Sequence, residues 1–242
     1  MNVSPMLIDL PRAIVRYPRQ GTLAVFRPEN DVSGIVLAVH GSGRGIDDYS
    51  RTPFYAKQRD ISLEYGHAFA VLEDGPDTYG TDEGVRNLTL AAEELFGLFH
   101  TDRIVLWATS AGGVCALRYA AGHREHVSAF IGTFPVVDLN AVFPILQSCR
   151  RAWDAEGMTP EGFAEKIKGK NPPDLFGSLC GLPMFIAHGL ADRAVPYKEN
   201  AAVLRRIGAN IHTIPDGVHG TEDYRYYEHA PHEAFEYLKH EK

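Results

Sequence analysis

The chain has 242 residues, of which 45% are hydrophobic and 23% are charged, and its formal net charge is −7 at pH 7. This length fits one large α/β domain, and the composition is that of a globular protein rather than a disordered chain. The negative charge argues against a nucleic-acid partner, because binding phosphates requires clustered lysine and arginine. No stretch reaches the roughly 20 apolar residues of a membrane span.

Short apolar runs alternate with amphipathic stretches along the chain. This alternation predicts a mostly parallel central sheet with helices on both faces. The first two runs flank Gly21 and are typical of a hairpin at one edge of the sheet. In chain order, the strands are expected at Ala13–Tyr17, Thr22–Phe26, Gly34–His40, Ala68–Leu72, Ile104–Trp107, Phe130–Phe134, Met184–Ala187 and Ile211–Ile214.

The amphipathic stretches predict the helices. Asp82–Phe99 repeats apolar residues at spacings of three and four, and two acids stand in its first turn, where the helix dipole favours negative charge. Gly122 and Gly208 are expected to end helices in the left-handed conformation. The remaining helices are expected at Ala111–Ala121, Glu199–Ile207 and Pro231–His240.

Residues 140–181 interrupt the alternation. Roughly 40 residues separate two strands there, too many for a simple loop, and they have helical patterns at Ala141–Ala152 and Pro160–Ile167. We interpret them as a small helical cap, inserted in a single domain of residues 1–242 and laid over the carboxyl ends of the strands. The cap has large apolar residues that either pack it against the body or line a pocket: Phe143, Leu146, Trp153 and Phe163.

A strand runs into Ser110, which is flanked by small residues, and a helix follows at once. Ala108 and Gly112 stand two positions to either side, so the segment is G-x-S-x-G with alanine in the first position. This pattern is typical of a nucleophile elbow, in which a sharp strand-to-helix turn holds the serine in a strained conformation. The N–H of Ala111 is then a candidate oxyanion donor. A serine that only caps a helix would fit the same residues.

A glycine-rich loop, His40–Gly45, follows another central strand. Its glycines let backbone N–H groups approach a substrate closely, and Ser42 is predicted to supply the second oxyanion donor. The loop lacks the lysine of a P-loop and the G-x-G-x-x-G spacing, so nucleotide binding is disfavoured. His40 is interpreted mainly as an orienting residue beneath the loop, and Arg44 is the candidate for meeting an anionic substrate. The candidates for substrate binding are His40, Gly41, Gly43, Arg44 and Tyr79.

Two further segments place a carboxylate and an imidazole just beyond predicted strands. Asp192 lies within His188–Pro196, and His219 lies in a glycine-bounded loop after the next strand. An imidazole with a pKa of about 6.5 suits a general base near physiological pH. Active groups in an open parallel sheet gather at the carboxyl ends of the strands. We therefore predict Ser110 as the nucleophile, His219 as the general base and Asp192 as the carboxylate that orients it.

The chain order Ser, Asp, His matches α/β-hydrolases, and the sequence resembles that superfamily over Gly34–Leu238. The His-Gly-Ser-Gly loop at His40, the Asn-Pro-Pro-Asp segment at Asn171 and the H-G-x-x-D-x-x-V-P block at His188 resemble prolyl-oligopeptidase-like and dienelactone-hydrolase-like esterases. The resemblance implies an α/β-hydrolase fold and a carboxylic-ester hydrolase. Two features depart from these relatives: dienelactone hydrolases use a cysteine where this chain has Ser110, and no propeller domain precedes the hydrolase region.

We predict a serine hydrolase that cleaves small-molecule carboxylic esters, with small acyl groups, through an acyl-enzyme intermediate. A thioesterase, a small-peptide hydrolase or an acyltransferase would use the same three residues, and the fold does not separate these activities. A non-catalytic binding protein is a further alternative, although such proteins commonly lose a member of the triad. The sequence does not indicate an oligomeric state.

The sequence also indicates a cytoplasmic protein without metal or cofactor. The first residues lack the basic start, apolar stretch and small-residue cleavage site of a secretory signal. The cysteines form no C-x-x-C pattern, so we expect neither a disulfide framework nor a zinc site. No histidine spacing matches a metal-ligand motif. The three cysteines are Cys115, Cys149 and Cys180.

Overall fold

The central sheet contains the predicted edge hairpin and core strands. The structure is a computed structural model that describes residues 13–16, 23–73 and 79–241, and these residues form eight strands. Tyr17 and Thr22, which the sequence analysis placed in the hairpin, lie outside the described residues. The strands are β1 (Ala13–Arg16), β2 (Leu23–Phe26), β3 (Gly34–Val39), β4 (His67–Leu72), β5 (Ile104–Thr109), β6 (Val127–Thr133), β7 (Met184–Gly189) and β8 (Asn210–Ile214).

The sheet is mostly parallel, as predicted. Its strand order is β1-β2-β4-β3-β5-β6-β7-β8. Strand β2 runs antiparallel to both β1 and β4, whereas the other neighbouring strands pair in parallel. The carboxyl ends of β3, β5, β6, β7 and β8 therefore meet at one edge, where loops from distant parts of the chain come together.

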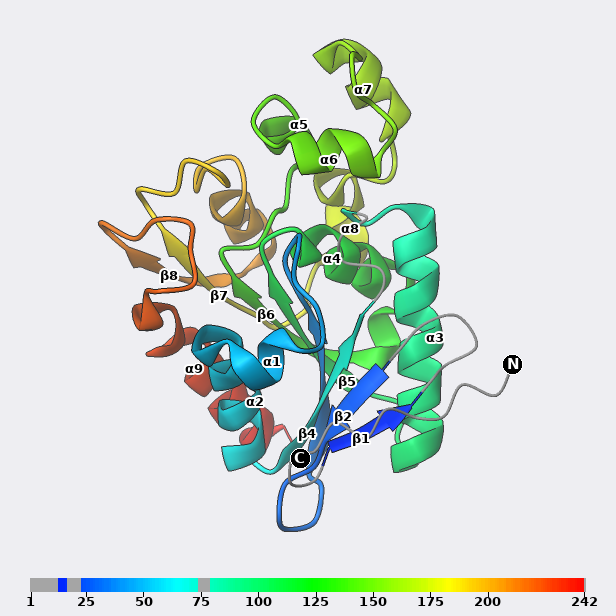
Figure 1. The fold of residues 1–242 in the computed structure, drawn as a ribbon, viewed down its shortest axis with the longest axis vertical. Helices are drawn as coiled ribbons and strands as arrows, with labels where there is room; N and C mark the ends of the chain where they lie inside the picture. Colours follow the sequence, from blue (N-terminus) through cyan, green and yellow to red (C-terminus); the bar gives the residue numbers. More distant parts are fainter. Residues whose placement is uncertain (1–12, 17–22, 74–78, 242) are drawn as a thin grey trace.

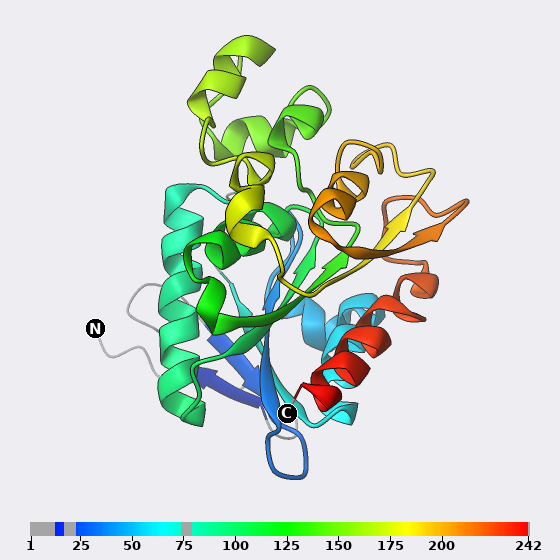
Figure 2. The ribbon, with the colours of Figure 1, turned by 180° about the vertical axis from the view of Figure 1, so that it is seen from behind.

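Helices cover both faces of this sheet, as Figures 1 and 2 show from opposite sides. Strand residues alternate between the two apolar cores: Leu37 packs on one face, and its neighbours Val36 and Ala38 pack on the other. One face is covered by α3 (Asp82–Phe99), α4 (Gly112–Gly122), α8 (Phe176–Leu179) and the 3-10 helix η4 (Ala201–Ile207). The other is covered by α1 (Asp48–Arg51), α2 (Pro53–Glu64), the 3-10 helix η5 (Tyr224–Tyr227) and α9 (Ala230–His240).

Three helical features differ from the sequence analysis. Helix α4 does end at Gly122, but the predicted left-handed conformation is wrong, because this glycine is the last helical residue and His123 caps the helix with a φ of −138°. Gly208 does adopt the left-handed conformation (φ +90°), but the segment before it is a 3-10 helix. Helix α2 was not predicted, because its inward face buries the polar side chains of Gln58 and Ser62.

The segment between β6 and β7 contains short helices that lie beyond the carboxyl ends of the strands, at the top of Figure 1. It packs on the body through a cluster that includes Phe143, Trp153 and Phe163, and the indole N–H of Trp153 donates to the carbonyl of Tyr79 at 3.2 Å. Its helices before α8 are α5 (Leu139–Val142), α6 (Gln147–Ala152), α7 (Pro160–Lys166) and the 3-10 helix η3 (Pro172–Leu175).

Candidate active site

Ser110 stands at a strained turn between β5 and α4. Its φ is +50°, in the left-handed region that non-glycine residues rarely adopt. Such a conformation costs on the order of 1–3 kcal/mol and persists only where the surroundings enforce it. Here the Ser110 N–H donates to the carbonyl of Thr133 at 3.1 Å, and its carbonyl accepts from the N–H groups of Gly113 (3.0 Å) and Val136 (2.8 Å). Three backbone hydrogen bonds therefore hold the turn.

Close backbone packing explains why the residue two positions after Ser110 is a glycine, Gly112. A Cβ on Gly112 would lie 2.1 Å from the carbonyl oxygen of Val39 and 2.7 Å from that of His40. Only glycine allows α4 to start against the end of β3. On the other side of the turn, Gln58 of α2 donates to the hydroxyl of Thr109 at 2.9 Å, so a helix missed in the sequence braces the residue before Ser110.

Ser110, His219 and Asp192 form one line of hydrogen bonds. Ser110 Oγ lies 3.0 Å from His219 Nε2, and His219 Nδ1 lies 2.7 Å from Asp192 Oδ2. Since a carboxylate only accepts, Nδ1 carries the proton, and Nε2 is left as the acceptor for the Ser110 hydroxyl. The structure thus brings together the three side chains that the sequence analysis singled out.

Asp192 is held as a buried carboxylate. Its side chain is fully buried, and Oδ1 accepts from the backbone N–H groups of Ala194 (2.9 Å) and Val195 (2.8 Å). The other oxygen faces His219. The loops that carry Asp192 and His219 approach closely, because a Cβ on Gly189 would lie only 2.2 Å from the carbonyl oxygen of Gly217.

His188 lies beside this carboxylate without belonging to the line. Its Nε2 is 3.6 Å from Asp192 Oδ2 and donates to the carbonyl of Val195 at 2.8 Å. Burial lowers the pKa of His188 to about 4, so its imidazole is neutral at physiological pH. A neutral ring adds no second charge next to the Asp192 carboxyl group.

The sequence analysis missed the residues that hold the His219 loop. The Phe134 ring packs on the His219 ring with centroids 4.5 Å apart, and Tyr226 donates its hydroxyl to the carbonyl of Val218 at 2.8 Å. Arg225 bonds Asp216 and Asp223, at the two ends of the loop. Phe134 directly follows β6 at the carboxyl edge of the sheet, and this position could have marked it as a residue of the site.

The glycine-rich loop approaches the nucleophile closely. A Cβ on Gly41 would lie 3.3 Å from Ser110 Cβ, and Gly43 has a φ of +70°. Ser42 lines the same cavity as Ser110, and Ala111 is buried directly after the nucleophile. Of the two predicted oxyanion donors, Ser42 thus lines the cavity, and Ala111 directly follows Ser110 in the chain.

A cavity of about 410 Å³ opens over Ser110. The candidates Gly41, Arg44 and Tyr79 line it, whereas His40 and Gly43 do not. His40 is fully buried, with Nδ1 2.9 Å from the carbonyl oxygen of Gly41 and Nε2 3.0 Å from that of Glu73. The cavity is lined by Gly41, Ser42, Arg44, Tyr55, Tyr79, Ser110, Phe134, Leu146, Ser148, Ala194, His219, Gly220 and Thr221.

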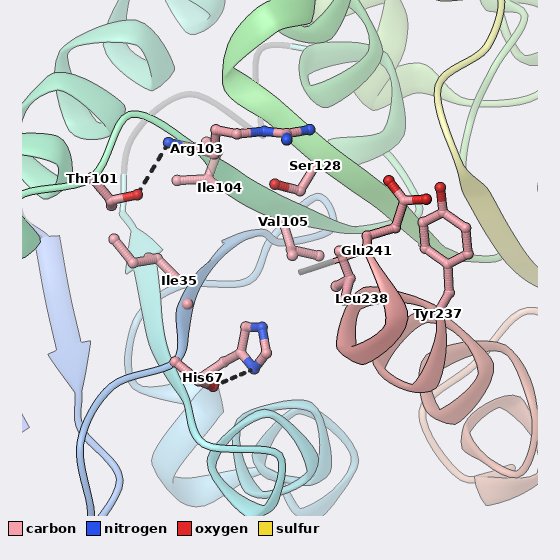
Figure 3. A pocket seen from close by; sticks show the side chains of 12 residues that line it. Ile35, His67, Thr101, Arg103, Ile104, Val105, Ser128, Tyr237, Leu238 and Glu241 are labelled. Carbon is pink, nitrogen blue, oxygen red and sulfur yellow. Dashed lines mark hydrogen bonds between the residues drawn. The ribbon is translucent and has the colours of Figure 1, made fainter.

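A second cavity, of about 160 Å³, lies at the opposite edge of the sheet, where β3, β4, β5 and β6 begin (Figure 3). It is lined by serine, histidine and acidic side chains: Ser33, Ser128, His67 and Glu241. Within the described residues, no group of three metal-binding side chains was found, nor any helix long and apolar enough to cross a membrane.

The fold and the hydrogen-bonded line define a serine hydrolase of the α/β-hydrolase type, which confirms the predicted fold class and enzyme class. The sequence model of the prolyl oligopeptidase family matches residues 60–241. The chain therefore belongs to the prolyl oligopeptidase family, as its motifs suggested. No curated protein sequence matches the chain significantly.

Solved structures agree with this fold. Est1E from Butyrivibrio proteoclasticus superposes with a TM-score of 0.71 at 18% identity, over 95% of this chain and 98% of that protein. The fluorophosphonate-binding serine hydrolase FphF of Staphylococcus aureus gives 0.70 at 15% identity, over 94% and 99%. An acylaminoacyl peptidase of Pyrococcus horikoshii gives 0.66 at 16% identity, over 95% of this chain but 40% of that one. At these identities the likeness establishes the fold alone.

Proposed function

We propose that the protein hydrolyses carboxylic esters through an acyl-enzyme on Ser110. The observation that carries this proposal is the line from the Ser110 hydroxyl through His219 to Asp192, with steps of 3.0 and 2.7 Å. Both distances are within proton-transfer reach. One of the similar structures holds ferulic acid bound to Est1E, which is consistent with a carboxylic acid product on this fold.

The proposed reaction has two halves. In the first, His219 Nε2 takes the Ser110 proton as Oγ attacks the ester carbonyl, and Asp192 stabilises the imidazolium. The N–H groups of Ser42 and Ala111 bind the oxyanion, and His219 returns the proton to the departing alcohol. In the second half, water attacks the acyl-enzyme with His219 as base, which releases the carboxylic acid and restores the Ser110 hydroxyl.

We propose that the chain is one catalytic domain and that residues 140–181 form a cap over its site. Leu146 and Ser148 from this segment line the cavity with Ser110. The Ser148 hydroxyl lies 2.6 Å from that of Tyr79, which ties the segment to the body beside the cavity. A cap in this place restricts the acyl group, so we expect kcat/KM to fall from acetyl to octanoyl esters.

The proposal includes a small-molecule substrate and a cytoplasmic location. The cytoplasmic location is supported by free thiols at Cys115, Cys149 and Cys180, all within the described residues. A reducing compartment keeps such thiols free. Cell fractionation with an antibody to the protein would test the location, and recovery outside the cytoplasm would contradict it.

Labelling with a fluorophosphonate tests the nucleophile, and a substrate panel tests the bond that is cleaved. We expect one label, on Ser110, and turnover of acyl-p-nitrophenyl esters that exceeds turnover of acyl-CoA and aminoacyl-anilide substrates. A label on another residue would contradict the assignment of Ser110. Faster cleavage of acyl-CoA or anilides would instead indicate a thioesterase or a peptide hydrolase.

A further inference from the structure

Arg44 brings a positive charge into the cavity over Ser110. Apart from this residue and His219, the side chains from the described part of the chain that line the cavity are neutral. The protein as a whole carries a net charge of −7, so a cation beside the nucleophile runs against the overall charge. The Arg44 side chain is 38% exposed. It is therefore partly shielded from water yet open to a ligand.

Two contacts orient the Arg44 side chain, and they use only one of its hydrogen-bond donors. Nη1 donates to Asp48 Oδ1 at 3.2 Å, and the guanidinium carbon lies 5.7 Å from the centre of the Tyr55 ring. Asp48 also accepts from the Gly45 N–H (2.9 Å) and the Thr52 hydroxyl (2.7 Å). Its charge is thus shared among three donors, and Arg44 holds the longest of these bonds.

The backbone places Arg44 in the turn next to Ser110. The Arg44 N–H donates to the carbonyl of Gly41 at 3.2 Å, which closes the turn that carries Ser42. Gly41 is the residue whose Cβ would touch both Ser110 Cβ and the Tyr55 hydroxyl. Arg44 therefore belongs to the same short turn as the proposed oxyanion donor, and it lines the same cavity as Ser110.

We infer that Arg44 binds a carboxylate carried by the substrate, so that the preferred substrates are esters with a second, anionic group near the scissile bond. This inference rests on the proposed ester hydrolysis. A guanidinium presents a planar fork that matches a carboxylate, and the charge-assisted hydrogen bonds strengthen in a partly desolvated site. Its bond to Asp48 uses only Nη1, so other donors of the guanidinium remain for a carboxylate in the cavity of about 410 Å³.

The test compares anionic esters with matched neutral ones. Mono-4-nitrophenyl glutarate and 4-nitrophenyl pentanoate place or omit a carboxylate on the acyl side, and 4-acetoxybenzoate and 4-acetoxybenzamide do so on the alcohol side. In at least one pair we expect wild type to favour the anionic ester in kcat/KM. Arg44→Gln should lower this anionic-to-neutral ratio roughly 10- to 100-fold, as expected for hydrogen bonds to a charged group. Arg44→Lys should lower it less.

Arg51→Gln is the matched control, because Arg51 makes an analogous i,i+4 pair with Asp47 but is 78% exposed and does not line the cavity. It should leave the ratio unchanged. A measurement on wild type needs no variant: raising NaCl from about 0.05 to 0.5 M should increase KM for the anionic ester only, since salt screens a partly exposed pair.

A ratio that Arg44→Gln leaves unchanged in both pairs, with neutral esters still cleaved, would overturn the inference and leave the proposed function standing. So would a KM for the anionic ester that does not respond to salt. No turnover of any ester, together with no label on Ser110, would instead overturn the proposed function and the inference with it.

Discussion

Both edges of the sheet carry a cavity with serine, histidine and acidic side chains in or beside it, yet only at the carboxyl edge do all three types join in one line of hydrogen bonds. At the carboxyl edge, Ser110 and Asp192 both face His219, at 3.0 and 2.7 Å. At the amino edge, Ser33 Oγ lies 3.5 Å from His67 Nδ1. However, Figure 3 shows Glu241 and Ser128 across the cavity from His67, so this acid does not complete a line. The residue types alone therefore do not define a site.

The backbone makes the difference between the two edges. Ser110 is forced out of its strand by a left-handed turn, whereas Ser128 continues β6 as an ordinary strand residue. His67 Nδ1 lies 3.2 Å from the carbonyl oxygen of Tyr65. Loops leaving the carboxyl ends of several strands bring distant side chains together, and this comparison can be tested by matched substitutions at the two edges.

The largest expected difference in kcat is between alanine substitutions of Ser110 and of Ser128. Ser110→Ala removes the nucleophile, so kcat for a p-nitrophenyl ester should fall roughly 10⁴- to 10⁶-fold. Ser128→Ala should leave kcat within about twofold of wild type. Steady-state assays, with circular dichroism to verify folding, measure both. Substantial turnover by a folded Ser110→Ala protein would contradict the assignment of the active site to the carboxyl edge.

Substitutions of the two acids, Asp192 and Glu241, should differ almost as much in their effect on kcat. Asp192→Asn preserves shape but removes the charge that stabilises a protonated His219, and an amide can favour the wrong imidazole tautomer. We expect kcat to fall on the order of 10⁴-fold. The counterpart at the other edge, Glu241→Gln, should retain kcat. Equal losses in the two variants would show that the effect comes from stability rather than from the site.

Much of the carboxyl-edge site could be predicted from the sequence, because the signals are local. Ser110 stands between small residues at the end of an apolar strand, and Asp192 and His219 follow β7 and β8. Each position depends on a strand end that short runs of residues reveal. The convergence of strand ends in a parallel sheet supplied the long-range step.

The residues that hold the site in place could not be predicted in the same way, because their roles depend on contacts between distant parts of the chain. Gln58 looks like a surface residue in the sequence, but it is buried and bonds Thr109 and Tyr227. Tyr226 and Phe134 act through packing across separate elements. Gly122 is typical of a left-handed helix cap, yet its φ is not positive and it is the last residue of α4.

The buried histidine beside the triad should make stability depend on pH. The pKa of His188 is lowered to about 4 by burial, while the unfolded chain has a value near 6.5. Between these values the unfolded state binds a proton that the folded state does not, so stability present above about pH 6.5 is lost as the pH falls towards 4. The loss from this residue is roughly 3 kcal/mol.

Urea denaturation from pH 7 to 4.5 measures this loss. His188→Gln, which cannot titrate, should flatten the fall in unfolding free energy, whereas His240→Gln, at an exposed position on α9, should keep it. Parallel curves for wild type and His188→Gln would show that His188 is not the group responsible.

The smallest expected effects come from two glycines of the same helix, one at the carboxyl edge and one far from it. Gly112→Ala must displace the carbonyl of Val39, 2.1 Å from the new Cβ, and shifts the start of α4 against the glycine-rich loop. Misplacement by about 1 Å can cost 10²-fold, so kcat should fall by roughly that factor. Gly122→Ala meets nothing within 4 Å and should stabilise the protein by up to about 1 kcal/mol with kcat unchanged. Thermal unfolding and kcat measured on both variants decide the matter: a Gly112→Ala enzyme with full activity would show that the elbow tolerates a side chain, and that close backbone packing does not distinguish this edge of the sheet.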